Sequence, residues 1–170
     1  MKYVITVILL LLFISNSEAQ QHKDKIKRTA QILLDATIEE DYSTVLDYSY
    51  PKLIALQGGK DSVLNMIKDG FKKMKAEGRE LVIVKGSLGD PGDEVKIGNS
   101  LYCVIPEMLT LMINKNYYKT TGSLIGISSD SGKNWVFVDA AGLDGLKTLV
   151  PDIDKLNIPP STGPTQIDNK

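Results

Sequence analysis

Residues 100–113, with the sequence SLYCVIPEMLTLMI, carry apolar side chains at both odd and even positions. Successive side chains of a β-strand point to opposite faces, so this pattern predicts a central strand that is covered on both sides. Pro106 has no N–H group to donate to a neighbouring strand, and we expect a bulge or bend at Pro106 and Glu107. The rest of the predicted fold is arranged around this strand.

Shorter strand patterns lie before and after the central stretch. They are β-branched or apolar runs bounded by turn residues, at 81–84, 94–97, 118–129 and 134–139. Turn residues at 114–116 and 130–133 join the later strands as hairpins, which predicts an antiparallel sheet.

Helical patterns precede the strands. The helical spacing of Ile26, Ala30, Leu33 and Thr37 predicts an amphipathic helix over residues 23–40. Asp41, Pro51 and Asp61 are typical residues for the start of three further helices. Helices followed by antiparallel strands indicate an α+β fold, with the N-terminal helices packed on one face of a curved antiparallel sheet.

The first 19 residues have the features of a secretory signal peptide. Lys2 precedes an apolar run over residues 3–14, and Ser17 and Ala19 place small side chains where signal peptidase accepts them. The run is shorter than the roughly 20 apolar residues that span a bilayer, and no cysteine follows it to take a lipid anchor. We therefore expect cleavage after Ala19 and a periplasmic or secreted protein without stable membrane insertion.

Cleavage would leave a single domain over residues 20–158 and a short C-terminal tail. The domain ends in a last helical pattern over residues 143–150. Residues 159–170, PPSTGPTQIDNK, have no apolar stripe to bury, so we expect this tail to be disordered.

Three stretches carry a resemblance to a known superfamily. They are residues 41–51, from Asp41-Tyr42 to Tyr50-Pro51, residues 58–61 with the sequence GGKD, and the hairpin over 128–139. With the order of the elements, these stretches resemble the NTF2-like superfamily of cystatin-like α+β cones, in particular secreted members from Bacteroidota-like bacteria. The resemblance implies a bent sheet around a long helix, and a cone whose mouth can hold a small apolar ligand.

Charge and composition exclude several classes of function. The chain has 20 basic and 21 acidic residues, which gives no basic field for nucleic acid. His22 is the single histidine and Cys103 the single cysteine, which excludes triad catalysis and zinc sites built on several His and Cys ligands. We expect no metal and no cofactor. Cys103 lies in the apolar strand and is expected to be a buried, inert thiol.

Residues 128–135, SSDSGKNW, match the S-x-D-x-G-x-x-W pattern of the Asp-box hairpin, which resembles the hairpins of sialidase-type propellers. Ser128 and Asp130 can bond amides of the turn, and Gly132 can adopt positive φ while Trp135 packs beneath the turn. One copy cannot build a propeller, so we interpret the motif as hairpin structure and not as a sugar-binding site.

Tyrosine and methionine side chains are candidates for the wall of a ligand pocket. Tyr42 and Tyr48 lie where a cone fold places its pocket, and Met108 and Met112 share one face of the central strand. Tyrosine offers an apolar body and a polar tip, which suits a pocket that binds a small apolar molecule. Residues of these types at this spacing are also typical of core packing.

Glu107 and Asp139 are the carboxylates expected nearest the apolar interior. A carboxylate in an apolar pocket beside a tyrosine hydroxyl can act as a base, as the resemblance implies for ketosteroid-isomerase-type members of the superfamily. The structural alternatives are Asp139 as the cap of the last helix and Glu107 as a bulge residue that points to solvent.

Three functions therefore stay open. The first is a non-enzymatic exported binding or accessory domain with a modest apolar pocket, favoured by an open apolar cavity without a titratable group. The second is an isomerase or dehydratase, favoured by a buried carboxylate with a raised pKa and a tyrosine within hydrogen-bond reach. The third is a module that binds another envelope protein, favoured by a closed cone.

Overall fold

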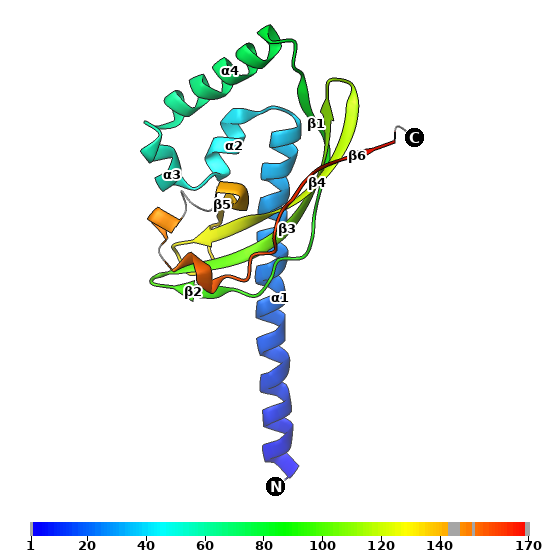
Figure 1. The fold of residues 1–170 in the computed structure, drawn as a ribbon. Coiled ribbons are helices and arrows are strands. Elements are labelled where there is room, and N and C mark those ends of the chain that lie inside the picture. Colours follow the sequence, from blue (N-terminus) through cyan, green and yellow to red (C-terminus); the bar gives the residue numbers. More distant parts are fainter. Residues whose placement is uncertain (1, 143–146, 151, 169–170) are drawn as a thin grey trace.

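The computed structural model describes residues 2–142, 147–150 and 152–168. Helices of the N-terminal half pack against a curled antiparallel sheet that forms a half-barrel, which confirms the predicted α+β fold (Figure 1). The predicted helix over 143–150 lies partly outside the described residues, and residues 147–149 of it are helical.

The helices differ in how they meet the sheet. Their bounds are α1 Lys2–Ile38, α2 Tyr42–Tyr48, α3 Pro51–Leu56 and α4 Lys60–Ala76. The C-terminal part of α1 packs on the sheet, whereas α4 lies away from it and contacts α2 and α3 (Figure 1). No helix in the described part of the chain is both long enough and apolar enough to cross a membrane.

Local sequence signals explain most helix starts. Asp41 caps α2 as predicted, because its carboxylate accepts the N–H of Thr44 at 3.2 Å. Pro51 is the first residue of α3, where its missing N–H costs nothing. The N-cap of α4 is Gly59, with φ of +91°, and not Asp61 as predicted. Asp61 lies in the first turn of α4, where its negative charge is favourable to the helix dipole.

The strands form one sheet in the order β1-β3-β4-β5, with β2 beside β3 and β6 beside β4. Their bounds are β1 Leu81–Leu88, β2 Val95–Ile97, β3 Ser100–Ile113, β4 Asn116–Ser128, β5 Val136–Asp139 and β6 Thr162–Ile167. The predicted central strand is β3, which pairs with β4 over its whole length. Asn114 and Lys115, both at positive φ, form the tight turn between these two strands.

The structure corrects the bulge predicted at Pro106. The β3–β4 ladder runs through Pro106, opposite Ser123, without a shift in register. On its other side Pro106 lies in the gap between β1 and β2, where its carbonyl accepts the N–H of Gly89 at 2.8 Å. The missing N–H of proline therefore removes no ladder bond, and the irregularity lies in β1 between Ile83 and Lys85.

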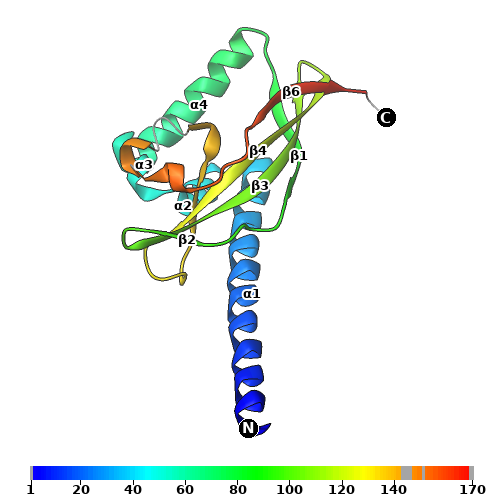
Figure 2. The ribbon, with the colours of Figure 1, turned by 60° about the horizontal axis from the view of Figure 1, so that its bottom comes forward.

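The C-terminal tail, predicted to be disordered, contains a strand. β6 pairs antiparallel with β4, with Tyr117 opposite Ile167 and Thr121 opposite Thr162, and it lies along β4 in Figure 2. All six side chains of β6 are exposed. Backbone hydrogen bonds hold such a strand without an apolar stripe, which is why the sequence pattern did not reveal it.

The first half of β3 is covered on both faces, as predicted. On one face Ile26, Ala30 and Leu33 of α1 pack on a cluster that includes Cys103, Ile105, Leu124, Trp135 and Phe137. On the other face the segment after β5 packs on the sheet through Val150, Ile153 and Leu156. The second half of β3 differs, because its side chains are half-buried or exposed.

Candidate functional site

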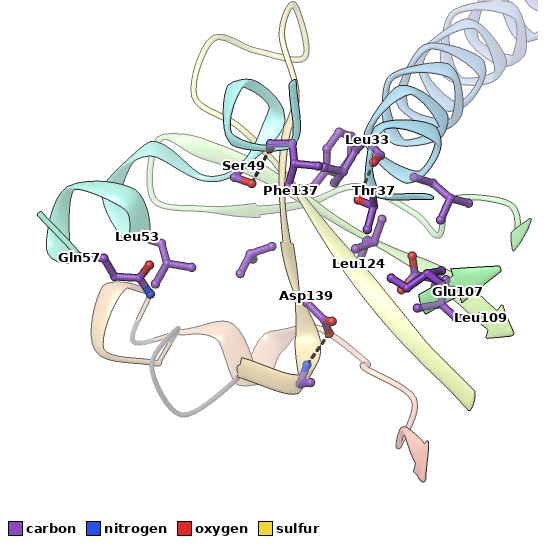
Figure 3. A pocket seen from close by; sticks show the side chains of 15 residues that line it. Leu33, Thr37, Ser49, Leu53, Gln57, Glu107, Leu109, Leu124, Phe137 and Asp139 are labelled. Atoms are coloured by element: carbon purple, nitrogen blue, oxygen red, sulfur yellow. Dashed lines mark hydrogen bonds between the residues drawn. The ribbon is translucent and has the colours of Figure 1, made fainter. Parts of the chain in front are cut away.

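A cavity of about 650 Å³ lies between the helices and the α1 side of the sheet (Figure 3). Its helical wall includes Leu33, Leu34 and Thr37 of α1 and Leu53 of α3, and its sheet wall includes Ile83, Leu109, Leu124 and Phe137. The wall is mainly aliphatic, and the volume is in the range of sites that bind small molecules.

Two glycines of β4 mark where the sheet face is filled and where it is open. A Cβ atom added at Gly126 would lie 2.8 Å from Sγ of Cys103. A Cβ atom added at Gly122, four residues earlier on the same face, would meet nothing within 4 Å. Gly122 pairs with Glu107 of β3, so the space beside Glu107 is open.

Glu107 lines the cavity, which corrects the expectation that it is a bulge residue pointing to solvent. Figure 3 shows its side chain beside Leu109, the next residue of β3 on that face. Burial in the apolar wall, and secondly the charge of Asp139, raise the pKa of the Glu107 carboxyl to about 7. Hydrogen bonds make no contribution to that pKa.

Asp139 is the second carboxylate on the cavity wall. It ends β5 and pairs with Leu124, and one of its oxygens accepts the N–H of Ala141 at 2.8 Å. Asp139 therefore caps a helical turn, as the structural alternative to a catalytic role predicted. The turn that it caps is the 3-10 turn Ala140–Gly142 and not the last helix. Because β4 lies between β3 and β5, the two carboxylates line the cavity from strands that are not neighbours.

The hydroxyl groups on the wall are occupied by their own helices. Thr37 donates to the Leu33 carbonyl at 2.7 Å, and Ser49 donates to the Val45 carbonyl at 2.7 Å (Figure 3). Lysine, arginine, histidine and tyrosine are absent from the lining that the structure describes. The two hydroxyls thus have no proton left to donate to a ligand, and the other polar side chains of the described lining are the two carboxylates and Gln57.

The four residues predicted to form the pocket wall do not line this cavity. The Tyr42 ring lies 5.7 Å from the ring of Phe71 in α4, and Tyr48 packs against the core cluster beneath α1. Met108 lines a second hollow of about 380 Å³, which shares Glu107 with the cavity and also includes Gly122. Met112 shares a sheet face with Met108, because the two residues lie four positions apart in one strand.

The Asp-box hairpin forms as predicted. The Ser128 hydroxyl accepts the N–H of Gly132 at 2.9 Å, and Asp130 accepts the N–H of Asn134 at 2.9 Å. Trp135 is buried and donates its indole N–H to the Gly132 carbonyl at 3.1 Å, while Gly132 has φ of +83°. The polar groups of the motif thus bond one another, as expected of hairpin structure.

Other candidates for chemistry are used structurally. Cys103 is fully buried, and burial raises its pKa to about 12, which confirms the predicted buried thiol. The acidic turn before β2 pairs with α1, as Asp90 contacts Lys27 at 2.6 Å and Asp93 contacts Lys23 at 2.8 Å. In the described ranges, no three His, Cys, Asp or Glu residues are grouped so as to hold a metal ion.

Comparisons of the chain with models of protein families, with curated proteins and with solved structures gave no match. The NTF2-like resemblance therefore stays a prediction.

Proposed function

We propose that this protein binds a small, mainly apolar molecule in the cavity between the helices and the sheet. The observation that carries the proposal is the open cavity of about 650 Å³ with a mainly aliphatic wall. Few polar groups interrupt this wall, and such a combination binds an apolar body while orienting one polar group. The open cavity also favours small-molecule binding over the function of an envelope interaction module, because a closed cone was expected for such a module.

A thermal-shift screen with sterol-like, aromatic and fatty compounds tests the proposal, because a ligand that binds only the folded state raises the melting temperature. Thr37→Phe places a ring in the cavity and should abolish the shift. Thr29→Phe is the matched control: Thr29 is also half-buried in α1 and also bonds the carbonyl four residues earlier, but it lies outside the cavity lining. Equal shifts in both variants would contradict this site.

Proton transfer by Glu107 is the second candidate function. A pKa of about 7 suits a general base or acid at neutral pH, and it is the observation that favours an isomerase or dehydratase. Against it, the described lining offers no tyrosine hydroxyl to stabilise a developing oxyanion. Exchange of carbon-bound protons of a bound ketone in D₂O, followed by NMR and lost in Glu107→Gln, would establish this function in place of simple binding.

Export is part of the proposal. The predicted leader falls within the N-terminal part of α1, and cleavage after Ala19 would leave the helical residues that contact the sheet intact. N-terminal sequencing of exported protein should read Gln20-Gln21-His22. Retention of the apolar run over residues 3–14 would contradict it.

A further inference from the structure

The charge on the cavity wall is of one sign. Glu107 and Asp139 are the titratable side chains of the described lining, and both are acidic. The parts of α1, α2, α3, β1 and β4 that face the cavity contribute uncharged side chains such as Leu34, Val45 and Ile83. A ligand in this cavity therefore meets negative charge that no basic side chain of the described lining offsets.

Within residues 2–142, 147–150 and 152–168, no side chain pairs with the charged form of Glu107. Its carboxyl group is on an apolar wall, and the charge of Asp139 repels its ionised form. Natural proteins usually pair a partly buried carboxylate with a cation or with several hydrogen-bond donors. Here neither contributes to its pKa, so a cation supplied from outside would relieve both the burial and the repulsion.

The position of Glu107 leaves room for such a cation. Gly122, its partner across the β3–β4 ladder, has no side chain, and a Cβ atom added there would meet nothing within 4 Å. Gly122 lines the second hollow, which meets the cavity at Glu107. Leu109 and Leu124 flank the carboxylate with apolar surface (Figure 3). A group bound there would contact the charge of Glu107 with its polar end and the aliphatic wall with its body.

We propose that the ligand of this cavity is an apolar molecule with a cationic amino group, and that Glu107, assisted by Asp139, is the counter-ion that selects it. This inference rests on the proposed function, because it names the class of molecule that the cavity binds. A neutral molecule of the same shape would leave the carboxylates unpaired, and an anionic one would be repelled by both.

The direction in which affinity changes with pH distinguishes an amine from a neutral ligand. Glu107 is charged above about pH 7, and an alkylammonium group, like that of lysine, keeps its proton to about pH 10. Affinity for an amine should therefore fall as the pH is lowered from about 8 to 5.5. A neutral ligand that accepts a hydrogen bond from protonated Glu107 would show the opposite trend.

Isothermal titration calorimetry of the full chain with 1-decylamine, 1-decanol and decanoate, below their micelle concentrations, tests the inference. At pH 8 we expect decylamine to bind at least about tenfold more tightly than decanol, and decanoate most weakly. At pH 6.5, titrations in two buffers of different ionisation enthalpy should reveal release of a proton on amine binding. Glu107→Gln should remove the preference for the amine and keep decanol binding.

Glu94→Gln is the matched control, because Glu94 is also a half-buried glutamate but lies outside the cavity lining, paired with His22 at 3.1 Å. It should keep the preference for decylamine. Equal affinities for decylamine and decanol, or a preference that survives Glu107→Gln, would overturn the inference while leaving the cavity as a binding site. Failure of all three compounds to bind would overturn the proposed function with it.

Discussion

The two halves of β3 lie in different environments although both halves are apolar in sequence. In the first half, Tyr102, Cys103 and Ile105 are at most 5% exposed, between α1 on one face and the segment after β5 on the other. In the second half, Glu107 and Leu109 face a cavity, and Met108 on the other face is 37% exposed. One strand thus combines a closely packed half in the core with an open half that lines the cavity.

The largest expected difference between the halves comes from removing an isoleucine. Ile105→Ala empties a fully buried site in the packed half and should lower the free energy of unfolding by about 2–5 kcal/mol. Ile113→Ala changes a half-buried residue on the same face of the same strand and should cost about 1 kcal/mol. Urea denaturation of both variants measures the difference, and equal losses would mean that the two halves are packed alike.

A methyl group added to β4 should act in opposite ways in the two halves. Gly126→Ala forces a Cβ atom to within 2.8 Å of the buried Sγ of Cys103 and should cost about 1–3 kcal/mol. Gly122→Ala meets open space and should be neutral or stabilising by up to about 1 kcal/mol, because alanine restricts the unfolded chain. Thermal unfolding distinguishes them; a destabilised Gly122→Ala would contradict the open space beside Glu107.

The two halves should also differ in their response to pH. The pKa of Glu107 is raised to about 7 in the folded protein, above its value of about 4.3 in an unfolded chain. The folded state then binds more protons between these values, so Glu107 lowers stability as the pH rises from about 4.5 to 7. Glu107→Gln should stabilise the protein by roughly 1–2 kcal/mol at pH 8 and have little effect at pH 4.

Asp130 of the Asp-box hairpin, in the turn that follows β4 beside the packed half of β3, provides the comparison for that experiment. Hydrogen bonds from Asn134 and Ser128 lower its pKa to about 2. Its contribution is present above the unfolded pKa of about 4 and is lost as the pH falls towards 2. Asp130→Asn should therefore destabilise the protein at pH 7 and lose that effect at low pH. If both substitutions changed the free energy of unfolding in the same direction at neutral pH, the expected difference between the two carboxylates would be wrong.

The smallest effect is expected from removing β6. Truncation after Ser161 deletes a strand whose side chains are all exposed, so it removes backbone hydrogen bonds and little apolar burial. The entropy lost on ordering the strand offsets much of the free energy of these hydrogen bonds. The truncation should therefore lower the free energy of unfolding by less than about 1 kcal/mol. Urea denaturation measures it. A loss as large as that of Ile105→Ala would show that β6 belongs to the packed half of the molecule.

Features that depend on neighbours in the chain were predicted well. The central strand, the Asp41 cap, Pro51 at the start of α3 and the Asp-box turn each follow from residues within about five positions of one another. The Gly59 cap was missed because Asp61 offered a stronger side-chain signal two residues later. Glu107 and Asp139 were named as the carboxylates nearest the interior, and both line the cavity.

The sequence by itself determined most of the helices and the strands of the core, and that Cys103 is buried, because these depend on local propensity and on the alternation of apolar residues. It did not determine which face of β3 holds the cavity, since a strand that is apolar on both faces looks the same from either side. Only the packing of α1 on one face decided that Glu107 lines the cavity while Met108 and Met112 lie on the other side. The pairing of β6 was likewise decided by the tertiary structure, because it depends on a free edge of β4 more than 40 residues away in the sequence.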